Sequence, residues 1–132
     1  IRKVDLGPAE LMTAIFVPDA PGCGAFRKLG ARRYLVISIA MVGAVVHAEG
    51  GRIVRARIAV GSCSPVARRL VALETALAGA TLGDVGGIVG QARLDELTPI
   101  DDVRASAAYR MDAVRTLVRR TVLDAVEKTD VA

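Results

Sequence analysis

The sequence has few of the residues from which most catalytic sites are built. Its 132 residues include one histidine, two cysteines, two tyrosines, two phenylalanines and no tryptophan. A single histidine excludes a multi-histidine metal site, and Cys23 and Cys63 are too far apart in the sequence for a metal-binding pair. His47 lies beside an expected turn, and a strand-end or surface position is favoured over a role as general base. We therefore expect no catalytic residue and no metal site in this chain.

Long hydrophobic runs and nucleotide-binding motifs are also missing. The longest apolar run, residues 34–46, is shorter than the roughly 18–20 residues that span a bilayer. No signal-peptide pattern is present, and neither are the GxSxG, GxxxxGK(S/T) and GxGxxG motifs. The glycines of GDVGGIVG do not follow an expected strand, so they do not predict a phosphate-binding loop. One cysteine pair makes a poor disulfide framework, and reduced thiols in a cytoplasmic protein are expected.

The chain is basic, with a net charge of +4 and an isoelectric point near 9.6. This surplus favours an anionic partner, which could be a nucleotide phosphate, a nucleic acid or an acidic protein surface. Nucleic acid is the weaker option, because single-strand binding needs aromatic platforms and few aromatic residues are present. The adjacent carboxylates Asp101 and Asp102 are better explained as helix caps than as an acid/base pair.

Side-chain alternation predicts an antiparallel sheet. We expect a first strand over residues 11–17, a central strand over 37–48 and a returning strand over 52–61. The Gly50-Gly51 pair between the last two predicts a type I′ hairpin turn. In the returning strand, one face is expected to consist of Val54, Ala56, Ile58 and Val60, and the other of Ile53, Arg55, Arg57 and Ala59. Residues 24–33 are expected to be a loop or one helical turn.

Three helices are expected after the strands. The first covers residues 65–77, with Ser64 as N-cap, and the second covers about 84–96, weakened by three glycines. The third and longest covers about 103–126, and the tail over 128–132 is expected to fray. Its buried stripe is expected to be Val114, Leu117, Val118, Thr121, Val122 and Ala125, and its solvated face Arg110, Arg115, Arg119 and Arg120. The fold predicted for residues 1–132 is one α+β domain, with a three- to four-stranded antiparallel sheet covered on one face by three helices.

The segment before the central strand is the best candidate for function. Phe26, Lys28, Arg32 and Arg33 place an aromatic ring and several cations beside the expected sheet. A solvated basic loop explains this pattern, and so does a surface for a planar, electron-rich or anionic ligand on which the ring stacks. The residues alone leave both explanations open.

Several segments, in this order, resemble the C-terminal domain of the FAD-binding (medium) subunit of molybdenum hydroxylases, the family of xanthine dehydrogenase and carbon monoxide dehydrogenase. They are AFRKLGARR, the Ile37-Ser38 pair, the GGRI turn, ARIAVGSCSPVARR, ALETALAG, LTPIDDVRASAAYR and the arginine-bearing helix that follows. The resemblance covers about residues 11–123. It implies an antiparallel sheet flanked by three helices, within an oxidoreductase that passes electrons from iron–sulfur clusters through FAD to an acceptor.

The same resemblance implies cofactor-binding residues. The family's aromatic-x-Lys motif falls on Phe26 and Lys28, and its aromatic residue, often tyrosine, lies near the isoalloxazine ring. Phenylalanine keeps the stacking and lacks the hydroxyl. An acidic residue that often precedes the central strand falls near Leu35, which cannot make that residue's flavin or ribityl contact. Leu77 matches a leucine that packs on the flavin.

The resemblance further implies that FAD is shared with an N-terminal domain, absent from this chain, whose glycine-rich loops hold most of the cofactor. We therefore expect the isolated chain to bind FAD weakly or not at all. The expected partners are that N-terminal FAD domain, a molybdopterin-binding large subunit and a 2Fe–2S small subunit, with no nucleic acid and no membrane. The alternative is a non-enzymatic basic module that docks an acidic partner.

Overall fold

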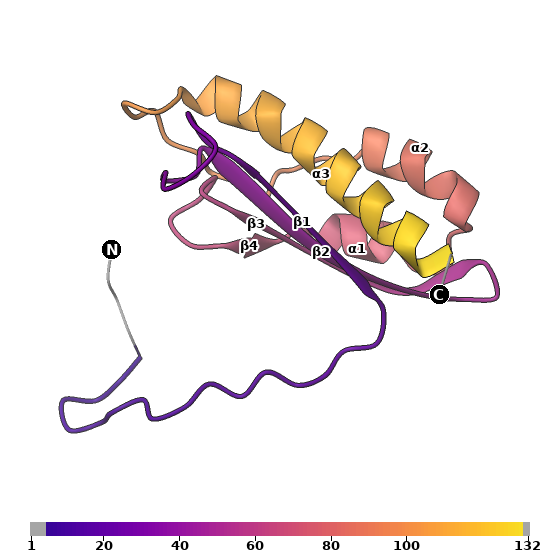
Figure 1. The fold of residues 1–132 in the computed structure, drawn as a ribbon, viewed down its shortest axis with the longest axis horizontal. Helices are drawn as coiled ribbons and strands as arrows, with labels where there is room; N and C mark the ends of the chain where they lie inside the picture. The colour runs from indigo at the N-terminus through magenta and orange to yellow at the C-terminus, as the bar shows by residue number, and fades with distance from the viewer. Residues whose placement is uncertain (1–4, 131–132) are drawn as a thin grey trace.

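The computed structural model describes residues 5–130, which form a four-stranded antiparallel sheet with helices on one face (Figure 1). The elements are β1 (Cys23–Leu29), β2 (Ala40–Glu49), β3 (Arg52–Gly61), β4 (Arg68–Arg69), α1 (Val71–Leu77), the 3-10 helix η1 (Leu82–Asp84), α2 (Val85–Gly90) and α3 (Ala107–Asp130). The strand order β1-β2-β3-β4 follows the chain, so each strand pairs with the next. The predicted α+β fold is confirmed.

The turn between β2 and β3 has the predicted form. Gly50 and Gly51 have φ angles of 55° and 74°, and Glu49 pairs with Arg52 on either side of them. Both central residues of a type I′ turn need positive φ, which glycine adopts without steric cost. This hairpin supplies the two long central strands of the sheet.

A β-bulge near the turn changes which side chains of β3 face the core. His47 pairs with Arg55, whereas Ala48 pairs with Ile53, so Val54 is an extra residue on β3. An extra residue shifts the alternation by one position. Ile53 is therefore buried at 2% exposure and Val54 is exposed at 51%, and the prediction for these two residues was wrong.

The first strand lies later in the chain than predicted. Residues 24–33 were expected to be a loop, but β1 occupies most of this segment and pairs with β2 along its whole length. Its alternation is hard to recognise in the sequence because one inward position is Arg27. That side chain is partly buried against α3 and forms an ion pair with Asp124 at 2.7 Å.

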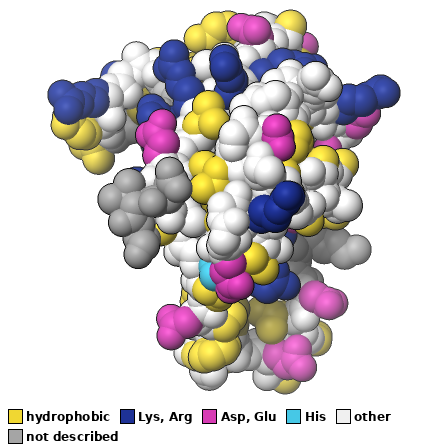
Figure 2. All heavy atoms as spheres, turned by 90° about the vertical axis from the view of Figure 1, so that its right-hand side faces the viewer, with side chains coloured by type: hydrophobic (Ala, Val, Ile, Leu, Met, Phe, Trp, Pro, Cys, Tyr) yellow, Lys and Arg dark blue, Asp and Glu magenta, His cyan; other side chains and the backbone are white. Residues whose placement is uncertain are grey.

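Residues 11–17, predicted to be a strand, are irregular and exposed. Their apolar side chains Leu11, Met12, Ile15, Phe16 and Val17 are 61–88% exposed. Figure 1 shows the stretch running below the sheet, on the side opposite α3. The narrow lower part of the space-filling view carries hydrophobic side chains with acidic ones among them (Figure 2). Within the described residues nothing covers this apolar segment, which explains why it forms no strand here.

Two of the three helices begin later than predicted: α1, and α3, which starts at Ala107 instead of about residue 103 because Asp102 and Ala105 pair in a turn before it. Arg68–Arg69 add β4 to the edge of β3, and the N–H of Leu70 donates to the Ile58 carbonyl, so α1 starts only at Val71. Ser64 consequently caps no helix and instead accepts a hydrogen bond from the N–H of Thr98. α2 ends early, at Gly90. Residues 128–130 of the tail belong to α3, and residues 131–132 lie outside the described part of the chain.

The core lies between the sheet and the helices. α3 lies across β1 and β2, while α1 packs against β3. The buried side chains of the described residues are mostly Val, Ala, Leu and Ile. Most of the predicted stripe of α3 is buried, with Leu117 only half-buried. None of the helices within residues 5–130 combines the length and the apolar character needed to cross a bilayer.

Candidate functional site

The face of the sheet opposite the helices carries the candidate site. Alternation along the three long strands determines which side chains lie on it, and the paired strands bring them side by side. The side chains on this open face are Phe26, Lys28, Met41, Gly43, Val45, Arg55, Arg57 and Ala59.

Phe26 lies at the centre of β1 and is 64% exposed. Its cross-strand partner is Gly43, and the next residue across the sheet is Ala59, so the two positions beside the ring carry almost no side chain. A shallow depression of about 570 Å³ results, bounded by the ring, Val45 and Arg57. Its volume falls in the range of small-molecule sites, roughly 300–1,000 Å³. An aromatic ring beside an open, flat floor provides a stacking surface.

The depression is surrounded by cations. Arg57, Arg69 and Lys128 line it, and no carboxylate does so among the residues that the structure describes. Arg69 is paired with Glu74, while Lys128 donates to the Gly24 carbonyl at 3.0 Å. The remaining positive field favours an anionic or electron-rich ligand over a cationic one.

Lys28 lies on the same face as Phe26, two residues along β1, and anchors the loop before β2. Its Nζ donates to the Val36 carbonyl at 2.7 Å, and Arg32 donates to the Leu35 carbonyl at 2.6 Å. Leu35 is 93% exposed and has a φ of 48°, which is unusual for a residue with a side chain. The loop containing Leu35 is thus tied to the end of the strand that carries the aromatic ring.

Leu77 lies apart from these residues. It is 1% exposed, at the end of α1 within the core between helices and sheet. Close to it in the chain, the Gly79 N–H donates to the Ile53 carbonyl at the hairpin end of β3, whereas Leu35 adjoins the opposite end of the sheet. The structure therefore brings Phe26 and Lys28 together, with Leu35 adjoining, while the side chain of Leu77 is closed to a ligand in this arrangement.

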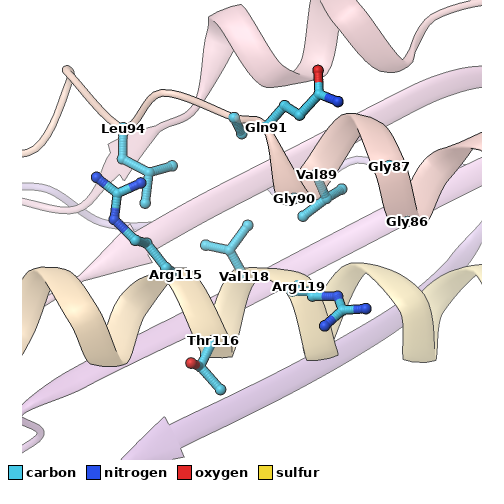
Figure 3. A pocket seen from close by; sticks show the side chains of 11 residues that line it. Gly86, Gly87, Val89, Gly90, Gln91, Leu94, Arg115, Thr116, Val118 and Arg119 are labelled. Atoms are coloured by element: carbon cyan, nitrogen blue, oxygen red, sulfur yellow. The ribbon is translucent and has the colours of Figure 1, made fainter.

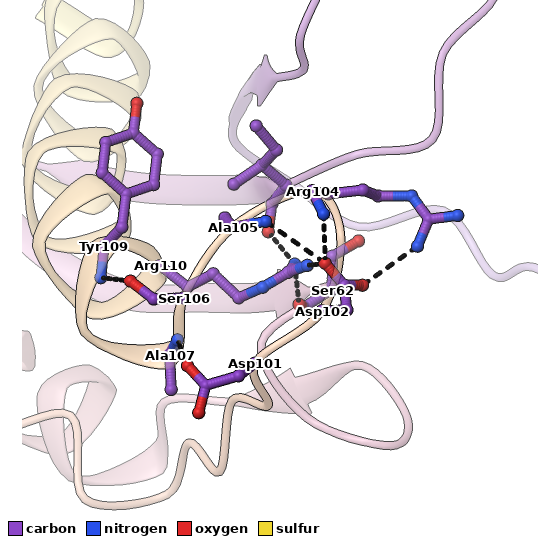
Figure 4. Close-up of polar contacts among 10 residues, drawn as sticks. Ser62, Asp101, Asp102, Arg104, Ala105, Ser106, Ala107, Tyr109 and Arg110 are labelled. Atoms are coloured by element: carbon purple, nitrogen blue, oxygen red, sulfur yellow. Dashed lines mark hydrogen bonds and ion pairs between the residues drawn. The ribbon is translucent and has the colours of Figure 1, made fainter.

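A buried ion pair fixes the end of the sheet next to this loop (Figure 4). Arg110 was predicted to be solvated, but it is 3% exposed. Its guanidinium donates to the carbonyls of Ile39 at 2.6 Å and Ser62 at 3.0 Å, and to Asp102 Oδ1 at 2.7 Å. The sequence did hold a signal for it, because Arg110 stands four residues before Val114, in phase with the buried stripe of α3.

Asp102 is held as a carboxylate by this network. The backbone N–H of Arg104 donates to it at 2.8 Å and, together with the side chains of Arg110 and Arg104, lowers its pKa to about 2 against the opposing effect of desolvation. Asp101 accepts a hydrogen bond from the Ala107 N–H at 2.7 Å, at the start of α3. Asp101 thus satisfies one free N–H at the start of α3, but the N-cap position itself is held by Ser106, which accepts from the N–H of Tyr109, so the predicted cap lay too early in the chain.

The remaining candidates form no reactive cluster. His47 lies at the bulge with its Nε2 3.1 Å from Glu49, and Cys23 and Cys63 are both free thiols. Within residues 5–130, no three His, Cys, Asp or Glu side chains are grouped so that they could hold a metal ion. The surface with the strongest ligand-binding geometry is thus the open sheet face around Phe26.

Comparison with known proteins assigns the chain to a family. The family described as CO dehydrogenase flavoprotein C-terminal domain matches residues 25–125. The chain belongs to this family. The matched range includes Phe26, Lys28 and all the described strands and helices apart from the first two residues of β1 and the end of α3. The resemblance inferred from the sequence is confirmed.

Curated relatives extend well beyond this domain. The chain is 32% identical to the nicotine 6-hydroxylase medium subunit of Paenarthrobacter nicotinovorans, over 94% of the chain and 44% of the relative. It is 33% identical to the 6-hydroxypseudooxynicotine dehydrogenase complex subunit alpha of the same organism, over 92% of the chain and 42% of the relative. The chain thus spans less than half the length of these relatives.

Solved structures share the fold. Quinoline 2-oxidoreductase from Pseudomonas putida 86 aligns with a TM-score of 0.71 at 21% identity, over 86% of this chain and 40% of that one. Carbon monoxide dehydrogenase from Hydrogenophaga pseudoflava aligns with a TM-score of 0.65 at 22% identity, over 86% of this chain and 40% of that one. In both cases the shared region is less than half of the longer chain.

Proposed function

We propose that this chain is the flavin-facing C-terminal domain of the FAD-binding subunit of a molybdenum-containing hydroxylase or dehydrogenase. A preceding domain would hold most of the cofactor, and the open sheet face of this chain would close over the isoalloxazine ring. The observation that carries the proposal is the exposed ring of Phe26 beside the depression over Gly43 and Ala59, in a chain of the flavoprotein family.

The residues of the open face fit one part of FAD. The ring of Phe26 and the flat floor beside it suit the planar isoalloxazine, and Lys28 and Arg57 suit its negative charge when reduced. The isoalloxazine would supply the electron-transfer chemistry, accepting electrons and passing them on. The residues of this chain would stack on the ring, exclude water from it and hold a positive charge close to it. We assign the binding of the pyrophosphate to the preceding domain.

A second feature supports a neighbouring domain. Five large apolar side chains between Leu11 and Val17 are exposed, although burying a side chain of this size is favourable by about 1.5–3 kcal/mol. The curated relatives are more than twice as long as the matched part, which leaves room for a domain that covers this stretch. On this proposal, the apolar stretch packs against the FAD-holding domain. A molybdopterin-binding subunit and a 2Fe–2S subunit would complete the electron path.

The proposal is tested in the subunit that joins this chain to its FAD-holding domain. Phe26→Ala should leave the fold intact, because the ring is mostly exposed, and should raise the quenching of flavin fluorescence by iodide. Tyr34→Ala is the matched control, since Tyr34 is also an exposed aromatic residue, at 68%, and lies in the loop beyond β1. Equal quenching in the wild-type and Phe26→Ala subunits would refute the flavin-facing role.

A titration of the 132-residue chain with FAD tests the shared site separately. Only weak binding is expected, because the isolated open face stacks on one side of the ring and leaves the rest of the cofactor in water. Submicromolar binding by this chain alone would show that the cofactor site does not depend on a preceding domain.

A further inference from the structure

A groove between α2 and α3 is not explained by the flavin-facing role. It has a volume of about 350 Å³ and lies on the helix side of the sheet, away from Phe26. Figure 3 shows Val89 of α2 and Val118 of α3 facing each other across it, with Leu94 near one end. The arginines Arg115 and Arg119 come from α3 on either side of Val118. The groove therefore has an apolar floor with a guanidinium group toward each end.

The depth of the groove comes from glycines of α2. A Cβ atom added at Gly86, Gly87 or Gly90 would meet no other atom within 4 Å, and none of the three has a positive φ. Neither packing within the described residues nor backbone conformation therefore requires glycine at these positions. Glycine weakens a helix relative to alanine, yet half of this six-residue helix is glycine. Side chains at these positions would fill the groove.

The charges along the groove are unbalanced. Arg115 and Arg119 are exposed, and neither makes an ion pair or a side-chain hydrogen bond with any residue in the described range. They stand four residues apart on one helix face, where like charges repel each other. The residues that line the groove, all of them within 5–130, include no carboxylate. An anionic occupant between the two guanidinium groups would remove this repulsion.

We propose that the groove between α2 and α3 binds a short acidic segment of a partner protein. Carboxylates of the segment pair with Arg115 and Arg119, and one apolar side chain between them lies over Val89 and Val118. Arg115 and Arg119 stand about one helical turn apart, so two carboxylates of one short segment can reach both guanidinium groups. Val89 and Val118 are already buried, at 6% and 1% exposure, so the charge pairs with Arg115 and Arg119 carry most of the interaction, and a small anion would satisfy only one of the two. Recognition of acidic motifs by paired arginines is a common mode of protein binding.

The test uses a fluorescein-labelled synthetic peptide in which one valine is flanked on each side by two glutamates. Fluorescence anisotropy with the 132-residue chain at low ionic strength should show saturable binding. Arg115→Glu and Arg119→Glu should each weaken it by about tenfold or more, because each removes one charge pair and adds a repulsion. A peptide with lysines in place of the glutamates should bind the Arg115→Glu/Arg119→Glu double variant. Arg120→Glu, an exposed position on the same helix outside the groove, is the matched control and should change the affinity far less.

A second variant separates binding from folding. Gly90→Leu fills the groove with a side chain and replaces a poor helix former with a good one, so the melting temperature should stay the same or rise while peptide binding is lost. The proposal is overturned if the peptide does not bind, if Arg120→Glu lowers the peptide affinity as much as the groove variants do, or if Gly90→Leu binds the peptide as well as the wild type. If inorganic phosphate at equal concentration displaces the peptide, the groove is a site for small anions and the proposal of a protein segment is wrong. None of these measurements involves flavin, so their outcome is independent of the proposed function.

Discussion

Replacing Arg110 with methionine tests whether the buried ion pair holds the end of the sheet together. The substitution removes three hydrogen bonds, two of which satisfy the carbonyls of Ile39 and Ser62. Each buried carbonyl left without a donor costs about 1–3 kcal/mol. The apolar methionine side chain offsets part of the cost of the two carbonyls, because it needs no hydrogen-bond partner when buried. We expect a loss of about 2–4 kcal/mol in the free energy of unfolding. For a chain of this size, that corresponds to a fall of roughly 10 °C in melting temperature.

Removing the other partner of the ion pair should lower the free energy of unfolding further. Asp102→Ala leaves the guanidinium of Arg110 buried at 3% exposure without its counter-ion, whereas in Arg110→Met the side chain of Asp102 is 24% exposed and can take up water. Removing one partner of a buried pair is most costly when the charge left behind is the more deeply buried one. The Arg110→Met/Asp102→Ala double variant should therefore be more stable than Asp102→Ala alone.

Urea unfolding of the three variants, followed by circular dichroism, measures these differences. Arg110→Lys is the matched control. It keeps the charge but lacks the planar fork of donors that reaches three acceptors, so its stability should lie between those of the wild type and Arg110→Met. The reasoning is refuted if Arg110→Met is as stable as the wild type, or if Asp102→Ala is the milder of the two single changes.

Three further predictions concern the stability and the thiols of the chain. Because the folded pKa of Asp102 is about 2, below that of an unfolded aspartate, its stabilising effect is complete above the unfolded pKa and is lost as the pH falls toward 2. Urea midpoints across this range should fall more steeply for the wild type than for Asp102→Asn, and parallel curves would contradict the assignment. A thiol reagent should label the half-buried Cys23 first and Cys63 only on unfolding. Cys63 is 0% exposed, and burial raises the pKa of its thiol against the opposing effect of Arg110. Rapid labelling of both thiols in the folded chain would contradict the packing. Gly51→Ala should destabilise the chain by about 1–2 kcal/mol, since its φ is 74°, whereas Gly87→Ala should stabilise it by up to about 1 kcal/mol; thermal melts that show the same sign for both would contradict the argument.

The sequence predicted the elements that have a local signal. The Gly50-Gly51 turn, the two strands around it and most of the buried stripe of α3 could be recognised from residue type and periodicity. The elements that were predicted wrongly depend on partners that are distant in the sequence. The start of α1 was misplaced because β4 forms only by pairing with β3, a contact that no pattern around Arg68–Arg69 indicates. The stretch over residues 11–17 has the composition of a strand, but the described part of the chain offers it no partner.

The candidate site, too, could be predicted from the sequence only in part. The pattern around Phe26 identified an aromatic residue near cations, and the family motif gave it a role that remains a proposal. The exposed depression beside the ring depends on Gly43 and Ala59 from two other strands, so only the strand pairing could reveal it. The distance between Leu77 and the open face also required the structure, because residue spacing does not say on which side of a sheet a helix lies.

By itself, the sequence determined the fold class, the family, the glycine turn and the lack of a multi-histidine metal site, because these depend on composition, on local periodicity and on the order of segments along the chain. Only the tertiary structure decided which charges are buried and which surfaces are open. Arg110 has the same side chain as Arg115 and Arg119, yet it is buried at the end of the sheet while they flank an open groove. The difference is made by the carbonyls of Ile39 and Ser62, which come from distant parts of the chain, and by Asp102, eight residues before Arg110; together they compensate its desolvation.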